Sequence, residues 1–281
     1  MTAVTDRASD ETYEVYALRY ASRQGRKATE YYGYGRYGDP DGPCVLDYYF
    51  WLARNAERTV LVDCGYSAER ARERGRRQDN EPNTDPIEVL ALLGIEPADV
   101  DHVIISHMHP DHVEDLDRFP TATFSIAREE YDFCTGAYAK KPLIADLVER
   151  WVVDLVKDLQ ADGRLRLVDG SEQLFPGIRV TRIGGHSPGQ MITEVATTSG
   201  QVVLASDATH FYEEMELDRP FWFFFDLEAT YRGYEKLREL AAKPGASVVP
   251  GHDPAVMTRF AVVEDGSVAD LTTPVGARAP A

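Results

Sequence analysis

The stretch ISHMHPDHVEDL, residues 105–116, places three histidines and an aspartate within six consecutive positions, 107–112. These side chains cost free energy to bury, yet they follow directly on the apolar run VDHVII (100–105). Imidazoles and a carboxylate at i, i+2, i+4 and i+5 are typical of metal ligands. The alternating positions 107 and 109 share a face beyond a strand, and Pro110 then starts a helix that returns 111 and 112 to the same cavity. One metal cannot easily take all four, whereas two adjacent metals can; a polar surface loop is the alternative.

Three further segments offer ligands at the ends of apolar runs. GGHSPGQ contains His186, LASDATH contains Asp207, and VVPGHDP contains His252. Each follows an expected strand, where a rigid scaffold passes into a loop and functional side chains are usually presented. Together with the opening stretch, they predict one composite metal site.

Charge and composition limit the partners. The 281 residues include 30 basic and 47 acidic side chains, for a formal net charge of -17, which disfavours binding to nucleic acid or to an anionic membrane. No apolar run approaches the roughly 18 residues that span a bilayer, and MTAVTDRASDE does not resemble a signal peptide. Three dispersed cysteines, Cys44, Cys64 and Cys134, indicate no disulfide framework. We therefore expect a cytoplasmic protein that acts on a small molecule.

Strand and helix patterns interleave along the chain without a linker or a repeat. They predict one α/β domain over 1–281, with loose tails at 1–12 and 272–281, and two sheets packed together with helices outside, which makes four layers. The expected strands are 13–21, 45–53, 59–65, 100–106, 121–127, 164–168, 178–183, 190–196, 201–206 and 246–251, and the expected helices are 85–94, one long helix through 143–159, and 227–242.

The motif series HxHxDH, GHSPG, SDA and PGH resembles that of the metallo-β-lactamase superfamily over about 45–255. The resemblance implies an αββα sandwich that binds two metal ions. Zinc is the expected metal, with iron, manganese or cobalt as alternatives. The resemblance also implies the ligands: for the first metal His107, His109 and His186, for the second Asp111, His112 and His252, with Asp207 bridging both. Asp63, at the end of VLVDCG, would orient ligands; the alternative is a simple turn residue.

Two metals about 3.5–4 Å apart supply a bridging hydroxide at neutral pH and hold the charge that develops on the substrate, so the reaction class is hydrolysis. AREEYDF (127–133) and the spacing from His112 to His186 resemble the N-acyl homoserine lactonases. This resemblance predicts a quorum-quenching lactonase that opens a small or acylated lactone. A thioester hydrolase of the glyoxalase II type, a phosphodiesterase, and a non-hydrolytic protein carrying iron stay open as alternatives.

One position departs from the lactonase pattern. Three residues after the bridging aspartate, where the lactonases have a tyrosine, this chain has His210, and Tyr212 lies two residues further on. A histidine can hydrogen-bond a carbonyl or donate a proton to a leaving alkoxide. The catalytic candidates are therefore Asp111, His210 and Tyr212; an exposed, idle His210 is the alternative.

Two aromatic stretches and one histidine have open roles. YYGYGRYGDPDGP (31–43) predicts either a mobile lid or a structured hairpin. RPFWFFFDL (219–227) predicts core packing, the wall of a substrate channel, or a homodimer contact. His102 lies within an expected strand, and we expect it to be a hydrogen-bonded core residue.

Overall fold

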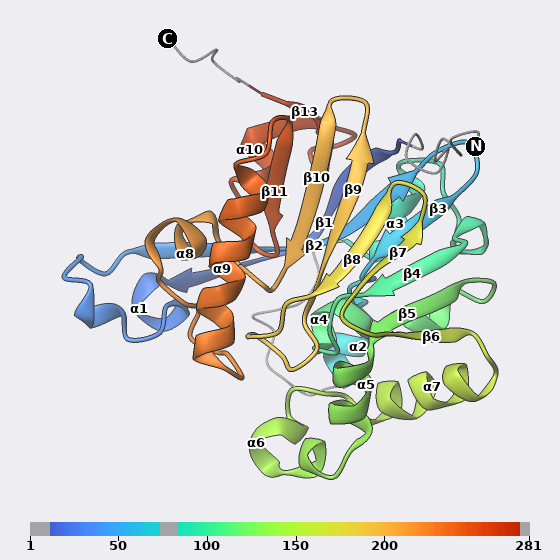
Figure 1. Ribbon diagram of the computed structural model, residues 1–281, viewed down its shortest axis with the longest axis horizontal. Coiled ribbons are helices and arrows are strands. Elements are labelled where there is room, and N and C mark those ends of the chain that lie inside the picture. The colour runs from blue at the N-terminus through green and yellow to red at the C-terminus, as the bar shows by residue number, and fades with distance from the viewer. Residues whose placement is uncertain (1–11, 74–83, 276–281) are drawn as a thin grey trace, which may run out of the picture.

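The computed structural model describes residues 12–73 and 84–275, which form two β-sheets flanked by helices (Figure 1). The larger sheet has the order β12-β13-β1-β2-β3-β4-β5-β6 and the smaller one the order β11-β10-β9-β8-β7. The larger sheet comprises β1 (Glu14–Arg26), β2 (Pro43–Arg54), β3 (Thr59–Val62), β4 (His102–Ile105), β5 (Thr123–Ala127), β6 (Leu165–Val168), β12 (Phe260–Val263) and β13 (Val268–Pro274). The smaller sheet comprises β7 (Ser171–Phe175), β8 (Ile178–Arg182), β9 (Met191–Thr197), β10 (Gly200–Ser206) and β11 (Ala246–Pro250).

The larger sheet is apolar on both faces. Along β2, Phe50 and Leu52 belong to one hydrophobic cluster, whereas the alternating residues Tyr49 and Trp51 belong to another. Successive side chains of a strand point to opposite faces, so a strand buried on both sides reads as a continuous apolar run. This pattern places the larger sheet in the interior, between the smaller sheet and a layer of helices.

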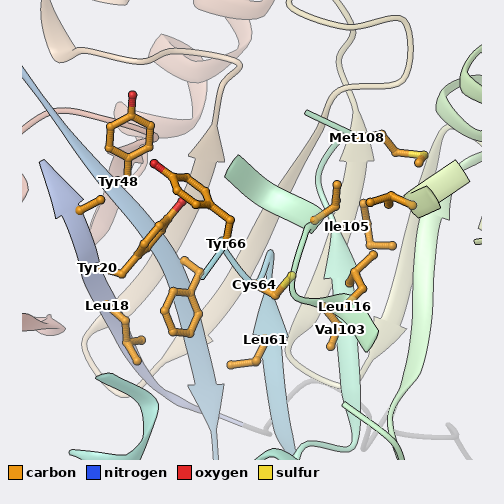
Figure 2. Packing of buried hydrophobic residues seen from close by; sticks show 14 of the residues in the cluster. Leu18, Tyr20, Tyr48, Leu61, Cys64, Tyr66, Val103, Ile105, Met108 and Leu116 are labelled. Atoms are coloured by element: carbon orange, nitrogen blue, oxygen red, sulfur yellow. The ribbon is translucent and has the colours of Figure 1, made fainter. Parts of the chain in front are cut away.

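Helices complete the outer layers. They are α1 (Lys27–Glu30), α2 (Ala68–Glu73), α3 (Pro86–Ala91), α4 (Pro110–Val113), α5 (Arg128–Thr135), α6 (Pro142–Ala145), α7 (Arg150–Ala161), α8 (Tyr212–Leu217), α9 (Leu227–Ala241) and α10 (Val256–Arg259). Leu90 of α3 and Val152 of α7 pack on the outer face of the larger sheet, in the cluster that Figure 2 shows in part. Leu237 of α9 belongs to the second hydrophobic cluster, and α9 lies against β11 on the outside of the smaller sheet (Figure 1). The four-layer α/β prediction is confirmed.

Two predicted boundaries are wrong. The single helix through 143–159 is two helices, α6 and α7, because the chain turns at 146–148 and Glu149 is extended at the start of α7. The apolar spacing hid this break, since Val148 within the turn and Val152 of α7 pack into the same cluster. The C-terminal tail does not begin at 272, because β13 runs to Pro274. The predicted N-terminal tail falls on residues 1–11, outside the described residues, and on Thr12.

The short strands β7, β12 and β13 were not predicted. Within the described residues, no helix combines the length and the apolarity that a membrane span requires. The three cysteines are buried thiols without a disulfide, as expected.

The fold brings strand ends of both sheets together at one edge. In the larger sheet β3 pairs with β4 in parallel, and in the smaller sheet β10 pairs with β11 in parallel. The hydroxyl of Ser106, directly after β4, lies 2.9 Å from the hydroxyl of Ser206 at the end of β10, and Met191 N–H of β9 donates to the carbonyl of Ser106 at 2.9 Å. The loops that follow these strands carry the histidines and aspartates of the sequence motifs.

Candidate metal centre

Four of the motif residues form a first set of candidate ligands. His107, His109, His186 and Asp207 each present one nitrogen or oxygen, and these atoms lie within 4.8 Å of one another. Nε2 of His186 lies 2.8 Å from Nδ1 of His109 and 3.3 Å from Oδ2 of Asp207. Strand alternation was expected to place His107 and His109 on one face. Instead a loop places them, since β4 ends at Ile105 and residues 106–109 have no regular structure.

A second set lies beside the first. The ligand atoms of Asp111, His112 and His252 are also within 4.8 Å of one another. Oδ2 of Asp111 lies 3.6 Å from Nε2 of His112 and 3.6 Å from Nε2 of His252. The helix expected from Pro110 is α4, with His109 at its N-cap, and it turns Asp111 and His112 toward the centre.

Asp207 lies between the two sets. Its Oδ1 is 3.4 Å from Nε2 of His112 and 3.1 Å from Nε2 of His252, both in the second set. Its Oδ2 is 3.7 Å from Nε2 of His107 and 3.3 Å from Nε2 of His186, both in the first. The two oxygens of one carboxylate therefore face different groups of histidines, which is the arrangement that a bridging ligand requires.

The residues present fit a pair of cations. Within the described part of the chain, Nε2 of His107, Nε2 of His112 and Oδ1 of Asp207 are buried and make no hydrogen bond. Buried polar atoms in proteins are almost always satisfied, and one cation in each set would together satisfy all three. Three imidazoles with one carboxylate, and two imidazoles with two carboxylates, are donor sets typical of zinc and of other first-row metals.

The electrostatics of the centre also favour cations. Burial lowers the pKa of His107 and of His186 well below the usual value, which keeps these imidazoles neutral, the form that binds a metal. At His112 burial is outweighed by the carboxylates of Asp207, Asp111 and Asp63, and its pKa is raised well above the usual value. The second set thus attracts positive charge, which a cation supplies as well as a proton does.

Asp63 holds the centre from behind. Its Oδ2 accepts a hydrogen bond from Nδ1 of His112 at 2.8 Å and from the hydroxyl of Ser106 at 2.8 Å, while Oδ1 accepts from Ser106 N–H at 2.8 Å. Asp63 itself has a φ of 63°, which is uncommon outside glycine. These contacts fit the predicted role of Asp63, which is to orient a ligand histidine from outside the centre, and the side chain is fully buried.

The glycine of PGH is needed for close packing. A Cβ at Gly251 would lie 2.5 Å from Oδ1 of Asp207, so a side chain there would displace the central carboxylate. Because residue 251 is a glycine, the backbone can pass close to Asp207, and His252 follows directly beside Asp111 and His112. The Nδ1 of His252 lies 2.9 Å from the carbonyl oxygen of Asp47, which leaves Nε2 for the second set.

A cavity of about 590 Å³ opens over both sets. Its size is that of ordinary small-molecule sites. Its lining includes the polar side chains of Arg23 and Tyr48 and the aromatic side chains of Phe221, Trp222 and Phe223. The segment 219–227 therefore contributes to the wall of a cavity, as one of its three interpretations predicted.

Comparison with known proteins places this arrangement in a family. Residues 45–252 match the profile of the metallo-beta-lactamase superfamily. The chain belongs to this superfamily. The motif resemblance is thereby confirmed over nearly the whole range in which it was predicted.

Several relatives within the superfamily are lactonases. The chain is 34% identical over 184 residues to an N-acyl homoserine lactonase, AttM, of Azorhizobium caulinodans; the match covers 61% of this chain and 65% of that protein, which is slightly less than two thirds of its length. In structure it is similar to an N-acyl homoserine lactone hydrolase with the product N-hexanoyl-L-homoserine at the catalytic metal centre (TM-score 0.70, 21% identity, 90% of this chain and 98% of that one). It is also similar to a dizinc quorum-quenching lactonase, AidC (TM-score 0.68, 18% identity, 86% and 88%).

His210 lies beside the candidate metal centre and is not on the surface. Its side chain is 2% exposed, its ring lines the cavity, and its Nε2 lies 3.2 Å from Oδ2 of Asp207. The alternative of an exposed His210 is wrong, and its catalytic role stays a prediction. The prediction of Tyr212 as a catalytic candidate needs correction. Tyr212 is not among the residues that line the cavity, and its ring packs against the guanidinium of Arg259, which lies 3.6 Å from the ring centroid.

The other open predictions are decided by packing. Tyr31 and Tyr34 are buried, and Tyr31 forms an isolated β-bridge with Phe221, so the start of the 31–43 segment is fixed against the cavity wall and is not a free lid. His102 is a core residue as predicted, with its ring nitrogens 2.7 Å and 2.9 Å from the hydroxyls of Thr123 and Ser125.

Two buried carboxylates beside the loops of the candidate metal centre were not predicted. Glu130, in the AREEYDF segment, accepts from Met108 N–H at 3.0 Å and from Gly189 N–H at 2.9 Å, and so ties the HxHxDH loop to the GHSPG loop. Glu214 lies beside His210 at the start of α8. Both residues read in the sequence as polar positions of short helices; the only signal is an acidic pair in the first turn of each helix.

Proposed function

We propose that this chain is a dinuclear metal-dependent hydrolase that opens a small or acylated lactone ring. The observation that carries the proposal is the position of Asp207, whose two carboxylate oxygens divide between two sets of histidines at the floor of the cavity. The similarity to an N-acyl homoserine lactonase of Azorhizobium caulinodans supports a lactone among the substrates of such a site.

His107, His109 and His186 would hold the first cation, Asp111, His112 and His252 the second, and Asp207 would join them. We propose zinc for both, because the donors are imidazole and carboxylate, with iron, manganese or cobalt as alternatives. When bound, such a pair of cations supplies Lewis acidity and a hydroxide nucleophile at neutral pH.

The residues of the chain supply orientation. Phe221, Trp222 and Phe223 of the cavity lining offer apolar area to an acyl chain, and Arg23 and Tyr48 contribute polar groups to the same lining. His210 lines the cavity beside Asp207, where its ring can hydrogen-bond the lactone carbonyl or the leaving oxygen. Asp111, 23% exposed as a side chain, is the ligand carboxylate most open to the cavity, and so it is the other candidate for contact with substrate.

The cavity wall argues against a phosphodiester. Arg23 is the one cationic side chain of the described lining, and its guanidinium is already paired with both carboxylate oxygens of Glu30 at 2.9 Å. A neutral lactone needs no further positive charge, whereas an anionic phosphate does. A thioester hydrolase on the same site is the remaining alternative.

A substrate panel tests the proposal. The zinc-loaded protein is assayed on N-hexanoyl homoserine lactone, on a simple γ-lactone, on a glutathione thioester and on a chromogenic phosphodiester. We expect the largest kcat/KM on the acylated lactone, with Asp207→Asn inactive and Asp154→Asn, an exposed substitution on α7, as active as the unchanged protein. A larger kcat/KM on the thioester or the phosphodiester would replace the lactonase by that alternative.

We also propose a cytoplasmic location and a homodimer. The three buried free thiols support a reducing compartment, and the half-exposed rings of Trp222 and Phe225 support a contact between two copies. Cell fractionation tests the first proposal, and light scattering of the protein and of Trp222→Ser tests the second. Recovery outside the cytoplasm, or a monomer at micromolar concentration, would contradict them.

A further inference from the structure

The hydroxyl of Tyr48 has an unused hydrogen beside the cavity. Tyr48 is 6% exposed, it lines the cavity, and its ring meets the ring of His252 edge to face, with 5.0 Å between the centroids. The hydroxyl accepts a hydrogen bond from Nε of Arg23 at 3.3 Å and makes no other within the described residues. Because a guanidinium has no acceptor, the hydrogen of the Tyr48 hydroxyl is not used in this contact.

Arg23 is a second donor, and the sheet sets it beside Tyr48. In the antiparallel ladder Tyr48 of β2 pairs with Ala21 of β1, so Arg23, two residues further along β1, is on the same face. Its side chain is 21% exposed and lines the cavity. Of its five N–H groups, three donate to Tyr48 and to the carboxylate of Glu30, and the other two make no hydrogen bond in the described part of the chain.

The carboxylate of Glu30 fixes the guanidinium and balances its charge. Oε1 and Oε2 accept from Nη1 and Nη2 of Arg23, each at 2.9 Å, in the bidentate geometry that holds a guanidinium in one plane. Glu30 is 3% exposed, and a Cβ at Gly25 would collide with its Oε1, so the carboxylate packs directly on the backbone of β1. The donors of Arg23 are therefore held in place, and the pair as a whole is neutral.

We infer that the hydroxyl of Tyr48 and the guanidinium of Arg23 form a subsite for a neutral carbonyl oxygen of the substrate, and that Glu30 is the positioning residue for Arg23. Donors without a partner favour an acceptor, and a balanced ion pair adds little attraction for an anion. Because the ring of Tyr48 packs against His252 of the second set, a carbonyl bound by its hydroxyl lies close to a lactone ring held at the metal centre.

This subsite would make the enzyme selective for lactones that carry an acylamino group beside the ring. The inference rests on the proposed function, which supplies the lactone ring; the donors of Tyr48 and Arg23 are independent of it. A site built to hydrogen-bond a polar group discriminates against an analogue that lacks the group, because its donors are then left unpaired. Selectivity between two lactones is therefore the quantity to measure.

Tyr48→Phe tests the first donor, since it removes only the hydroxyl and keeps the ring beside His252. N-hexanoyl homoserine lactone carries the carbonyl beside the ring, whereas a γ-lactone with an alkyl chain of the same length lacks it. We expect the ratio of kcat/KM on the acylated lactone to kcat/KM on the γ-lactone to fall by about 3- to 10-fold, the effect of one lost hydrogen bond between neutral groups. An unchanged ratio would overturn the inference.

Arg23→Lys tests the second donor at constant charge. The ammonium still faces Glu30, but lysine has neither the planar fork nor the Nε–H that reaches Tyr48. We expect the same ratio to fall by about 10- to 100-fold, because this hydrogen bond comes from a charged donor. Arg26→Lys is the matched control, since Arg26 is an exposed arginine of the same strand and does not line the cavity; it should leave the ratio unchanged.

Glu30→Gln separates positioning from support of the fold. Glutamine keeps one acceptor oxygen but cannot accept from both nitrogens of Arg23, so the guanidinium loses its fixed plane. A positioning role predicts that the ratio falls, whereas an equal loss on both lactones would reduce Glu30 to structural support and overturn its part of the inference. Thermal unfolding of each variant shows whether it is folded.

A binding measurement does not depend on turnover. In the lactam analogue of the acylated lactone, N–H replaces the ring oxygen and the ring is not readily opened. Calorimetric titration of the zinc-loaded protein should show affinities that are lower by about 3- to 10-fold for Tyr48→Phe and by about 10- to 100-fold for Arg23→Lys, and unchanged for Arg26→Lys. No binding to the unchanged protein, or one affinity for all four proteins, would overturn the inference. If no lactone is turned over but Tyr48→Phe weakens lactam binding as expected, the proposed function fails while the subsite stands.

Discussion

Oδ2 of Asp63 accepts a hydrogen bond from Nδ1 of His112 at 2.8 Å, on the side of the ring opposite the candidate metal position. A carboxylate behind a ligand histidine fixes the ring and raises its basicity. Asp63 makes this contact from a left-handed backbone conformation, with a φ of 63°, that asparagine also tolerates.

Asp63→Asn should therefore fold but bind the second cation more weakly. We expect the affinity for that cation to fall by about 10- to 100-fold, because asparagine has no charge and only one acceptor oxygen: if that oxygen takes the place of Oδ2 beside His112, the amide nitrogen faces Ser106 N–H, which Oδ1 now accepts. Chelator competition measures the change, with Asp154→Asn as the surface control. Unaltered affinity for both cations would reduce Asp63 to a turn residue.

Asp207→Asn should release both cations together. One carboxylate faces both histidine sets, and the substitution removes its charge and replaces one oxygen by a nitrogen that cannot ligate. Metal analysis after gel filtration should find less than half of the normal content, and turnover should be lost with it. Retention of one tightly held cation would show that the two sets are independent.

His210→Ala should leave the metals in place and slow turnover. His210 lines the cavity but is not one of the seven residues in the two sets, so its loss removes a contact to substrate and not a ligand. We expect kcat to fall by about 10²–10⁴-fold, the range for a group that transfers or shares a proton in the transition state. Metal content at the normal level together with full activity would mean that His210 only fills space.

The stability of the protein should fall on acidification, in part through His102. Burial lowers the pKa of His102 from 6.5 to about 4, and its ring nitrogens lie beside two hydroxyls. Between these two pKa values the unfolded chain binds more protons than the folded one, so the free energy of unfolding decreases as the pH falls from 6.5 toward 4. The full shift corresponds to about 3 kcal/mol.

Comparison with His102→Gln isolates this contribution. Urea unfolding at pH 7 and at pH 4.5 should show a smaller pH dependence for the variant, because glutamine can hydrogen-bond both hydroxyls but does not titrate. Parallel pH curves for the two proteins would assign the acid sensitivity to other groups.

Much of the fold follows from local patterns. The continuous apolar run of β2 can be recognised from adjacent residues, and so can the cap and stop of α3, where Asp85 accepts a hydrogen bond from Ile87 N–H at 2.9 Å. The break between α6 and α7 was missed because apolar spacing reports which face is buried and not whether the backbone is continuous. β12 and β13 were missed too; they form a local hairpin, and β13 joins the sheet by pairing with β1, at the other end of the sequence, which no local pattern reports.

The same distinction applies to the centre. Candidate metal ligands can be recognised from the sequence when they are histidines in HxHxDH or directly after strands, since few roles other than metal binding explain such spacing. Glu130 and Glu214 cannot be recognised in this way, because the sequence does not distinguish a buried carboxylate in a short helix from an exposed one. Only the fold places the oxygens of Glu130 between two ligand loops and those of Glu214 beside the ring of His210. Tyr212 was misassigned for the converse reason: its position near His210 in the sequence does not place it in the cavity.

The number of divalent cations bound per chain tests the central claim most directly. The purified protein is stripped with a chelator, reconstituted with zinc, passed through a desalting column and analysed by mass spectrometry of the elements against protein concentration. Two sets joined by Asp207 predict two zinc ions per chain, with neither retained by Asp207→Asn. A folded protein that retains no zinc, or saturates at one ion per chain, would contradict the account.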